Sequence, residues 1–312
     1  MANVGKPLSA ISAGELYTDL ILSGFDFWPA PGQEAFAREF HREIGGGAAI
    51  TACGLARLGT PTGVLGVVGE DGEWLTAELR RQGVDTSDIR IDGSEPTAFT
   101  VAVTAPGDRA LITYIGANLR FPATLAEAAA AQKLSQARHV HLAFAPELDG
   151  AADLFLAIRG NGCTVSLDVG WHEEWLADPR ALAALRWVDI FFPNETEARR
   201  ITGEDDPERC LRRFAEAGLK RVALKLGASG AALLWEGSVL FGAPHPAPSV
   251  DTTGAGDCFD AGFLHAWLRR KTPEAILQTA NICGALCTEK YGGIAGFPNA
   301  ARLKHELTAN QC

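Results

Sequence analysis

The sequence has little basic charge and no extended basic segment. Its 312 residues include 28 Lys and Arg against 38 Asp and Glu, which gives a formal net charge of −10. The longest basic run is Arg269-Arg270-Lys271. Nucleic acids and anionic membranes are bound through concentrated basic faces. The composition therefore argues against both kinds of partner.

The seven cysteines follow no disulfide or metal-binding spacing. No CxxC pair occurs, and most of the cysteines stand in apolar runs, so we expect buried free thiols in a reducing compartment. Cys283 and Cys287 lie four residues apart on one expected helix, but without a facing His or Cys they do not form a zinc site. The N-terminal segment lacks the apolar core of a signal peptide, and no run is apolar enough to span a membrane. We therefore expect a cytoplasmic protein.

Two common nucleotide-binding motifs are also missing. The sequence contains no GxxxxGK(S/T) segment, which argues against a P-loop kinase. Gly254 and Gly256 begin a Gly-x-Gly pattern, but Phe259 stands where a dinucleotide fingerprint needs glycine. A Rossmann oxidoreductase is therefore not supported.

Short apolar strands alternate with helical segments along most of the chain, of which 47% is hydrophobic. This alternation predicts an α/β fold with a mostly parallel sheet and helices on both faces. Length alone fits one large domain or two smaller ones. The expected core strands are residues 8–14, 64–69, 139–142, 163–167, 188–192 and 221–226.

Other local patterns interrupt or delimit these elements. Two β-rich runs, residues 97–103 and 110–114, are joined by a turn sequence and predict a hairpin that belongs to a small β-sheet. Thr124 and Glu127 have capping-box spacing and predict the start of a helix reaching about residue 136. Thr272 and Pro273 predict the start of another helix, which should reach about residue 291.

The stretch from Val250 to Arg270 is the most informative part of the sequence. A loop with two glycines, Gly254 and Gly256, leads into an almost uninterrupted apolar helix pattern. Such a loop lets backbone N–H groups at a helix start face an anion. Asp257 could be an ordinary acidic residue at the start of a helix. It could also deprotonate a substrate hydroxyl while the loop holds a phosphoryl group.

This stretch, DTTGAGDCFDAGF, resembles the C-terminal signature of the ribokinase family, also called PfkB-type carbohydrate kinases. Gly45-Gly46-Gly47 is similar to the N-terminal signature of that family, and Asn194 with Glu197 matches its Asn-x-x-Glu motif. The resemblance spans residues 8–298. It implies a single three-layer α/β domain over residues 1–312, with a mostly parallel central sheet and a small β-sheet lid built from about 16–40 and 88–118.

The resemblance implies an ATP-dependent kinase that phosphorylates a primary hydroxyl of a small carbohydrate, with Mg²⁺ as cofactor. Asp257 would take the proton, and the N–H groups of Gly254, Ala255 and Gly256 would hold the transferred phosphoryl. Asp19 would bind sugar hydroxyls, although the local pattern alone favours an ordinary loop residue. With Asp19, the resemblance places Gly46, Gly47 and Ile50 at the acceptor, and Ile50 replaces an Asn that the family commonly carries.

The resemblance also places residues around the nucleotide and the cations. Asn194 and Glu197 would bind Mg²⁺ through water, although a capped helix with acids in its first turn explains Asn194 and Glu195 without any function. Lys225, Gly227, Gly230 and Asn281 would lie along ATP, although a glycine-rich hairpin turn explains the two glycines as well. A monovalent cation such as K⁺ would be enclosed, as in some members, by Asp251, Thr253, Cys287, the Lys290 carbonyl, Gly292 and Gly296.

Several alternatives remain open from the sequence. The acceptor could be ribose, fructose or 2-keto-3-deoxygluconate, or a nucleoside whose purine stacks on Phe25, Phe27, Trp28, Phe99 or Tyr114, which could equally be lid core. An inactive ligand-binding relative is a further alternative, which the intact Asp257, Asn194 and Glu197 argue against. The lid could pair two chains into a homodimer. His139 and His141 alternate on one strand and could bind a metal, although such pairs are more often core or surface.

Overall fold

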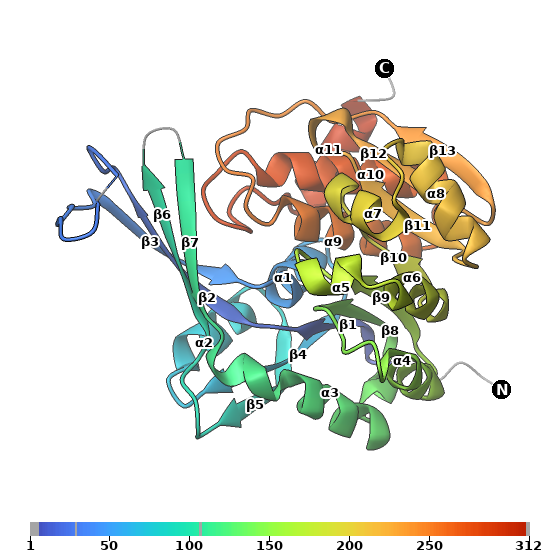
Figure 1. Ribbon diagram of the computed structural model, residues 1–312, viewed down its shortest axis with the longest axis horizontal. Helices are drawn as coiled ribbons and strands as arrows, with labels where there is room; N and C mark the ends of the chain where they lie inside the picture. The colour runs from blue at the N-terminus through green and yellow to red at the C-terminus, as the bar shows by residue number, and fades with distance from the viewer. Residues whose placement is uncertain (1–5, 29, 106–107, 310–312) are drawn as a thin grey trace.

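The chain forms two β-sheets that differ in size and in strand direction (Figure 1). The computed structural model describes residues 6–28, 30–105 and 108–309. Within these residues, the large sheet has nine strands and the small sheet has four. No helix among them combines the length and apolar character that a membrane crossing requires.

The large sheet has the strand order β13-β12-β11-β10-β9-β8-β1-β4-β5. Every neighbouring pair from β11 to β5 is parallel, and β12 and β13 run antiparallel at one edge. The expected mostly parallel sheet is therefore confirmed. The strands are β1 (Leu8–Gly14), β4 (Thr62–Gly69), β5 (Asp85–Asp92), β8 (Ala137–Ala143), β9 (Thr164–Asp168), β10 (Ile190–Phe191), β11 (Arg221–Lys225), β12 (Ala231–Trp235) and β13 (Ser238–Gly242).

Helices cover both faces of the large sheet, and each face has its own apolar core. Parallel strands buried on both sides carry continuous apolar runs, which is why their positions could be predicted. The helices of one face are α3 (Phe121–Ala130), α4 (Ala151–Gly160), α5 (Glu173–Ala177), α6 (Arg180–Ala184), α7 (Glu195–Thr202) and α8 (Pro207–Glu216). Those of the other face are α1 (Gly47–Arg57), α2 (Glu73–Arg81), α9 (Ala255–Leu268), α10 (Pro273–Cys287) and α11 (Ala300–Ala309). Short 3₁₀ helices are η1 (Gly116–Arg120), η2 (Lys133–Gln136), η3 (Leu185–Trp187) and η4 (Gly227–Ser229).

The small sheet projects from the edge of the body beside α1 and α2 (Figure 1). Its strands, in the order β3-β2-β6-β7, are β3 (Glu39–Gly45), β2 (Tyr17–Ser23), β6 (Phe99–Ala105) and β7 (Asp108–Tyr114). The predicted hairpin is present, since β6 and β7 pair antiparallel. Part of its turn, residues 106 and 107, falls outside the described residues.

Several expected boundaries differ from the structure. The segment 16–40 is too short, because β3 reaches Gly45, and the segment 88–118 includes β5, which belongs to the large sheet. The strand β5 is an edge strand with polar exposed positions, so it lacks an apolar run. The capping box at Thr124 is wrong: α3 begins at Phe121, and the Thr124 hydroxyl donates to the Arg120 carbonyl at 2.9 Å. Helix α10 starts at Pro273 with Thr272 as its N-cap, as predicted, and ends at Cys287.

Candidate active site

The loop before α9 and the start of that helix are built as the sequence predicts. Gly254 is the N-cap of α9 with φ +72°, a left-handed conformation that suits glycine. The Ala255 N–H donates to the Thr252 carbonyl at 3.2 Å, so one of the three expected anion-binding N–H groups already closes a turn. The positive end of the α9 helix dipole lies at the helix N-terminus, next to this loop.

Asp257 lies in the first turn of α9 and faces the start of α1. A Cβ at Gly47 would stand 2.7 Å from Asp257 Oδ1, so only glycine leaves room for this carboxylate. The Thr51 hydroxyl of α1 donates to the Asp257 backbone carbonyl at 3.2 Å and ties the two helices together. Burial raises the pKa of the Asp257 carboxyl to about 7, Asp168 adds to the rise and Lys225 opposes it.

A cavity of about 350 Å³ opens between α9, α1 and the small sheet. It is lined by Tyr17, Asp19, Ile21, Gly46, Gly47, Ile50, Thr100, Ala102, Leu111, Thr113, Asp251, Thr252, Thr253, Gly254, Asp257 and Tyr291. All four residues expected at the acceptor are therefore brought together with Asp257. Volumes of this order are typical of small-ligand sites.

Asp19 reaches the cavity from the small sheet rather than from a loop after the first strand. It lies within β2, in register with Glu43 on β3 and Thr100 on β6. Gly45 packs directly against its carboxylate, where a Cβ would collide. Burial, with help from Glu43 and Asp251, raises the pKa of Asp19 to about 6.

Ile50 contributes an apolar patch to the cavity and also packs against the α9 loop. A Cβ at Gly293 would stand 2.6 Å from Ile50 Cδ1, and one at Gly254 would stand 3.2 Å from the same atom. Only 3% of the Ile50 surface is exposed. This residue therefore packs against the loop and faces the cavity at once.

The aromatic residues considered for purine stacking do not line the cavity. Thr100 and Ala102 face it, so Phe99 lies on the opposite side of the small sheet, where its ring packs against Tyr114 at 5.6 Å. Phe25 is buried, and Phe27 and Trp28 are each 48% exposed outside the cavity. The rings in the cavity wall belong instead to Tyr17 and Tyr291.

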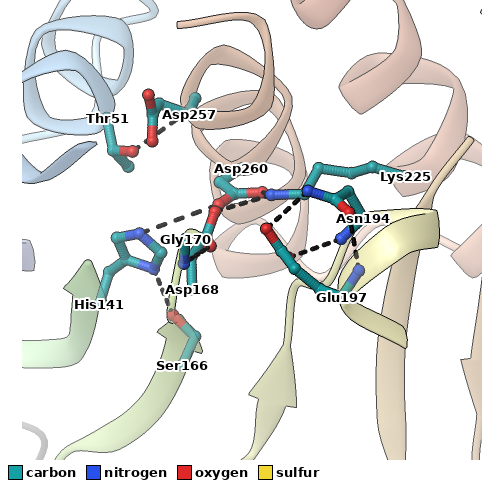
Figure 2. Close-up of polar contacts among 10 residues, drawn as sticks. All are labelled: Thr51, His141, Ser166, Asp168, Gly170, Asn194, Glu197, Lys225, Asp257 and Asp260. Carbon is teal, nitrogen blue, oxygen red and sulfur yellow. Dashed lines mark hydrogen bonds and ion pairs between the residues drawn. The ribbon is translucent and has the colours of Figure 1, made fainter. Parts of the chain in front are cut away.

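A buried cluster of ionisable groups lies beside Asp257 (Figure 2). Lys225 Nζ is 2.7 Å from Asp168 Oδ2 and 3.4 Å from Asp260 Oδ1. Burial opposes the Lys225 charge, but Asp168, Asp260 and Glu197 more than offset it and raise the pKa of the ammonium. Burial raises the pKa of Asp260 well above its usual range, and the Lys225 charge opposes that rise.

Sequence reasoning missed Asp168 and Asp260. Both carried a signal: Asp168 ends the core strand β9, where ligands gather in parallel sheets, and Asp260 is a charged residue inside an apolar helix pattern. Asp260 is fully buried one turn after Asp257. Its partners come from β9 and β11, which are distant in the sequence.

The two strand histidines are core residues. His139 and His141 are both fully buried, and both hydrogen-bond Ser166 Oγ at 2.8 Å. His141 Nε2 lies 4.0 Å from Asp260 Oδ2. Burial lowers the pKa of His141 to about 4. In the described parts of the chain, no three His, Cys, Asp or Glu side chains converge as metal ligands.

Comparison with known proteins identifies the family. The model of the pfkB family carbohydrate kinases matches residues 10–300. The chain belongs to the PfkB family. An ATP-dependent ribose-1-phosphate kinase of Halopiger xanaduensis is 33% identical over 285 residues, which cover 90% of this chain and 92% of that protein.

Two solved structures support the same assignment. The Arabidopsis thaliana ribokinase complexed with ribose and ATP is 27% identical, covers 97% of this chain and 99% of its own, and has a TM-score of 0.82. An Escherichia coli protein in complex with ATP and Mg²⁺ is 25% identical, with the same coverage and a TM-score of 0.83. The three-layer fold and the ATP-dependent carbohydrate kinase activity predicted from the sequence are thus confirmed.

A second cavity of this PfkB kinase, of about 460 Å³, lies beyond the end of β13. It is lined by residues 240–245 and by Glu274, Leu277, Gln278, Asn281 and Ile282. The Asn281 amide donates to the Gly242 and Ala243 carbonyls at 3.2 and 3.0 Å. Gly227 and Gly230 do not line this cavity; they form the turn from β11 to β12, with φ +56° and +89°.

The Asn-x-x-Glu motif of the kinase forms a capping box at the start of α7. Glu197 N–H donates to Asn194 Oδ1 at 3.0 Å, and Asn194 N–H donates to Glu197 Oε2 at 2.9 Å. Burial raises the pKa of Glu197 to about 7, and Asp168 adds to the rise. The motif therefore caps the N-terminus of α7. Its buried carboxylate next to the Lys225 cluster also suits a hydrated divalent cation.

The residues expected around a monovalent cation form one turn-rich cluster. Asp251 accepts from Thr253 N–H at 2.9 Å and from Gly292 N–H at 2.9 Å. The Cys287 thiol lies 3.7 Å from the Thr253 carbonyl. Gly296 packs against the Cys287 carbonyl, where a Cβ would collide, and Lys290 stands in the turn before Gly292.

Proposed function

We propose that the enzyme transfers the γ-phosphoryl of ATP to a primary hydroxyl of a small sugar bound in the cavity beneath the small sheet. The observation that carries this proposal is the position of Asp257. Its carboxylate shares the cavity with Asp19 and stands at the start of α9, against Gly47. A base within reach of the acceptor and next to an anion-binding helix start is the arrangement that phosphoryl transfer requires.

Each residue has a defined task in this reaction. The Asp257 carboxylate accepts the hydroxyl proton as the oxygen forms its bond to the γ-phosphorus, and the bond between that phosphorus and ADP breaks. The start of α9, at Gly254 and Gly256, stabilises the charge on the transferred group. Lys225, whose Nζ would be 3.4 Å from a Cβ at Gly256, adds a positive charge behind the loop.

A divalent metal would be held near the capping box. The carboxylate of Glu197 and the amide of Asn194 already satisfy one another, so they would hold Mg²⁺ through water, as hydrated Mg²⁺ commonly requires. When bound, Mg²⁺ neutralises phosphate charge. Lys225, Gly227, Gly230 and Asn281 are assigned to the nucleotide side.

The small sheet is the lid of a single kinase domain over residues 1–312. Its outer face exposes Phe40 and Ile112, at 59% and 66%, and we assign this face to a homodimer contact. Light scattering tests it, since Ile112→Lys should then yield monomers. If the wild-type enzyme is monomeric, the dimer assignment is wrong, and the assignment of the small sheet as a lid is unaffected.

Two further assignments concern ions and location. The cluster of Asp251, Thr253, Cys287, Lys290, Gly292 and Gly296 would hold K⁺, tested by comparing turnover in potassium and tetramethylammonium salts. The six described cysteines, from Cys53 to Cys287, are free and buried, which suits a cytoplasmic enzyme. Cell fractionation tests that location.

The deciding experiment is a coupled ADP-release assay with a panel of sugars and nucleosides, in which mass spectrometry identifies the product. A sugar phosphate formed by wild type and not by Asp257→Asn supports the proposal. ATP binding without phosphorylation of any acceptor would instead support an inactive binding protein. A nucleoside monophosphate as the main product would move the acceptor to the nucleoside class.

A further inference from the structure

A stripe of polar side chains crosses the core between the large sheet and α9. His139 and His141 lie on one face of β8, and their register partners on β9 are Thr164 and Ser166. The His139 ring packs edge-on against Trp267 of α9, with ring centroids 5.0 Å apart. Both histidines and Ser166 are fully buried. Polar groups in a core are costly unless they are hydrogen-bonded, and the proposed reaction uses none of these.

Hydrogen bonds join the stripe into one chain. His139 Nδ1 lies 2.9 Å from Thr164 Oγ1, and His139 Nε2 lies 2.8 Å from Ser166 Oγ. His141 Nδ1 lies 2.8 Å from the same Ser166 oxygen. Burial lowers the pKa of both histidines, that of His141 to about 4, so at about pH 7 each ring is neutral and carries one N–H. The Ser166 hydroxyl has one hydrogen, so it donates to one ring and accepts from the other.

The stripe ends at Asp260, which faces His141 from α9 (Figure 2). His141 Nε2 and Asp260 Oδ2 are 4.0 Å apart, and among the described residues neither atom has a hydrogen-bond partner. Both side chains are fully buried. A shift of about 1 Å brings the two atoms within hydrogen-bond distance. Leaving both unpaired in the core would be costly.

Asp260 also contacts Lys225, on the phosphate side of the site. Its other carboxylate oxygen, Oδ1, is 3.4 Å from Lys225 Nζ, and Asp168 Oδ2 holds the same ammonium at 2.7 Å. Lys225 stands behind Gly256, which belongs to the anion-binding loop. The direction of the Asp260 carboxylate therefore influences where the ammonium lies relative to that loop.

We propose that His141 is a positioning residue for the kinase reaction, whose Nε2–H donates to Asp260 Oδ2 and thereby keeps Asp260 Oδ1 on the Lys225 ammonium. This inference rests on the proposed function, in which Lys225 adds positive charge behind the loop that holds the transferred phosphoryl. Loss of the His141 N–H frees the Asp260 carboxylate to rotate. The ammonium is then held by Asp168 alone, and the transfer step slows.

This assignment fixes the direction of every hydrogen bond in the stripe. With its proton on Nε2, His141 accepts from the Ser166 hydroxyl at Nδ1. Ser166 Oγ then accepts from His139 Nε2–H, and His139 Nδ1 accepts from the Thr164 hydroxyl. Each ring nitrogen has one partner, and both rings carry their proton on Nε2.

Two amide substitutions at His141 test its role. The amide N–H of glutamine stands near the place of histidine Nε2, whereas asparagine reaches only the place of Nδ1. His141→Gln should keep kcat within about threefold of wild type, and His141→Asn should lower it about tenfold, as expected for one lost hydrogen bond. The acceptor KM and the ATP Kd should stay within about twofold in both variants. Equal kcat in two variants of equal Tm would refute the role.

The same substitutions in a Lys225→Gln enzyme test the path to the phosphate. If His141 acts through Lys225, His141→Asn should lower kcat by less than about twofold in this background, because the two effects are not additive. A further loss of about tenfold would show that His141 acts independently of Lys225, and that result would overturn the proposal.

NMR of the enzyme labelled with ¹⁵N-histidine reads the tautomers without turnover. His139 and His141 should both carry the proton on Nε2, and a proton on Nδ1 of His141 would contradict the proposal. Asp260→Asn turns an amide N–H toward His141 Nε2, because its oxygen faces Lys225, so both protons should move to Nδ1. Unchanged tautomers in that variant would also count against it. If wild type phosphorylates no acceptor, the proposed function fails, whereas the tautomers still decide whether His141 donates to Asp260.

Discussion

Lys225 Nζ donates to Asp168 Oδ2 at 2.7 Å (Figure 2), and both members of this pair act on the Asp257 carboxyl through their charges. The two partners act on Asp257 in opposite directions, because Asp168 raises its pKa and Lys225 lowers it. Burial of Asp257 is the larger effect and leaves its pKa at about 7. The base is thus poised near neutral pH, where a proton acceptor works most efficiently.

Replacing Asp257 tests its role as the base. Asp257→Asn should lower kcat by about 10²–10⁴ and leave ATP affinity and the fold intact. The matched control lies one turn later: burial raises the pKa of Asp260 well above its usual range, and Asp260→Asn keeps the shape of the side chain and an oxygen for Lys225, so it should retain most activity. Near wild-type turnover of Asp257→Asn would refute the assigned role.

The pH profile should report the same carboxyl. Since the base acts when ionised, kcat/KM should rise with pH through about 7, the pKa of Asp257. Asp168→Asn removes a negative neighbour and leaves Lys225 in place, so the rise should move to lower pH. If the pH profile of Asp168→Asn is the same as that of wild type, Asp168 does not influence the pKa of the base.

The raised pKa also predicts a stability effect. The Asp257 carboxyl binds its proton more tightly in the folded state than in the unfolded state, where its pKa is 3.8. Folding is therefore disfavoured progressively as pH rises from about 4 to about 7. Asp257→Asn should accordingly raise Tm at pH 8 and change it little at pH 4, which calorimetry would show. If the difference in Tm between Asp257→Asn and wild type is the same at pH 4 and pH 8, the pKa of Asp257 is not raised.

Two variants of Glu197 distinguish the helix-capping role of the α7 motif from its proposed role in metal binding. Glu197→Ala should raise the Mg²⁺ concentration needed for activity more than it raises the sugar KM. Glu197→Gln keeps an oxygen that can accept the Asn194 N–H, so it should preserve the helix start and still weaken the Mg²⁺ response. Glu195→Ala is the control, because Glu195 lies in the same helix turn and pairs with Arg199 on the exposed side. If both Glu197 variants titrate Mg²⁺ as wild type does, the motif is only a cap.

The acceptor pocket is tested by two variants with the same sugar panel. Asp19→Ala should weaken use of the true acceptor by about 1.5–3 kcal/mol, the value of a hydrogen bond to a charged group, while ATP affinity stays within a factor of a few. Ile50→Asn should shift preference toward a more hydroxylated sugar. Loss of ATP binding in Asp19→Ala would remove that residue from the acceptor site. An unchanged sugar ranking in Ile50→Asn would leave Ile50 as packing against Gly293.

The parts of the site that could be predicted depend on short-range geometry or on a motif. Gly254 and Asp257 lie within one turn of each other. The strands of the large sheet that are buried on both faces carry continuous apolar runs, which can be recognised in the sequence. The polar strand β5 and the pair Asp168–Asp260 could not be placed in the same way. β5 is placed by its pairing with β4, and the two carboxylates are brought together by segments roughly 90 residues apart along the chain, which no local pattern records.

The two cavities take their walls from different parts of the molecule. The one containing Asn281 is formed entirely by β13, α10 and the residues that follow β13, whereas the one containing Asp257 takes about half of its wall from the small sheet. The shape of the cavity at Asp257 therefore depends on where the small sheet lies, whereas the shape of the cavity at Asn281 does not. A substitution that repositions the small sheet should accordingly change the KM of the acceptor more than the affinity for ATP.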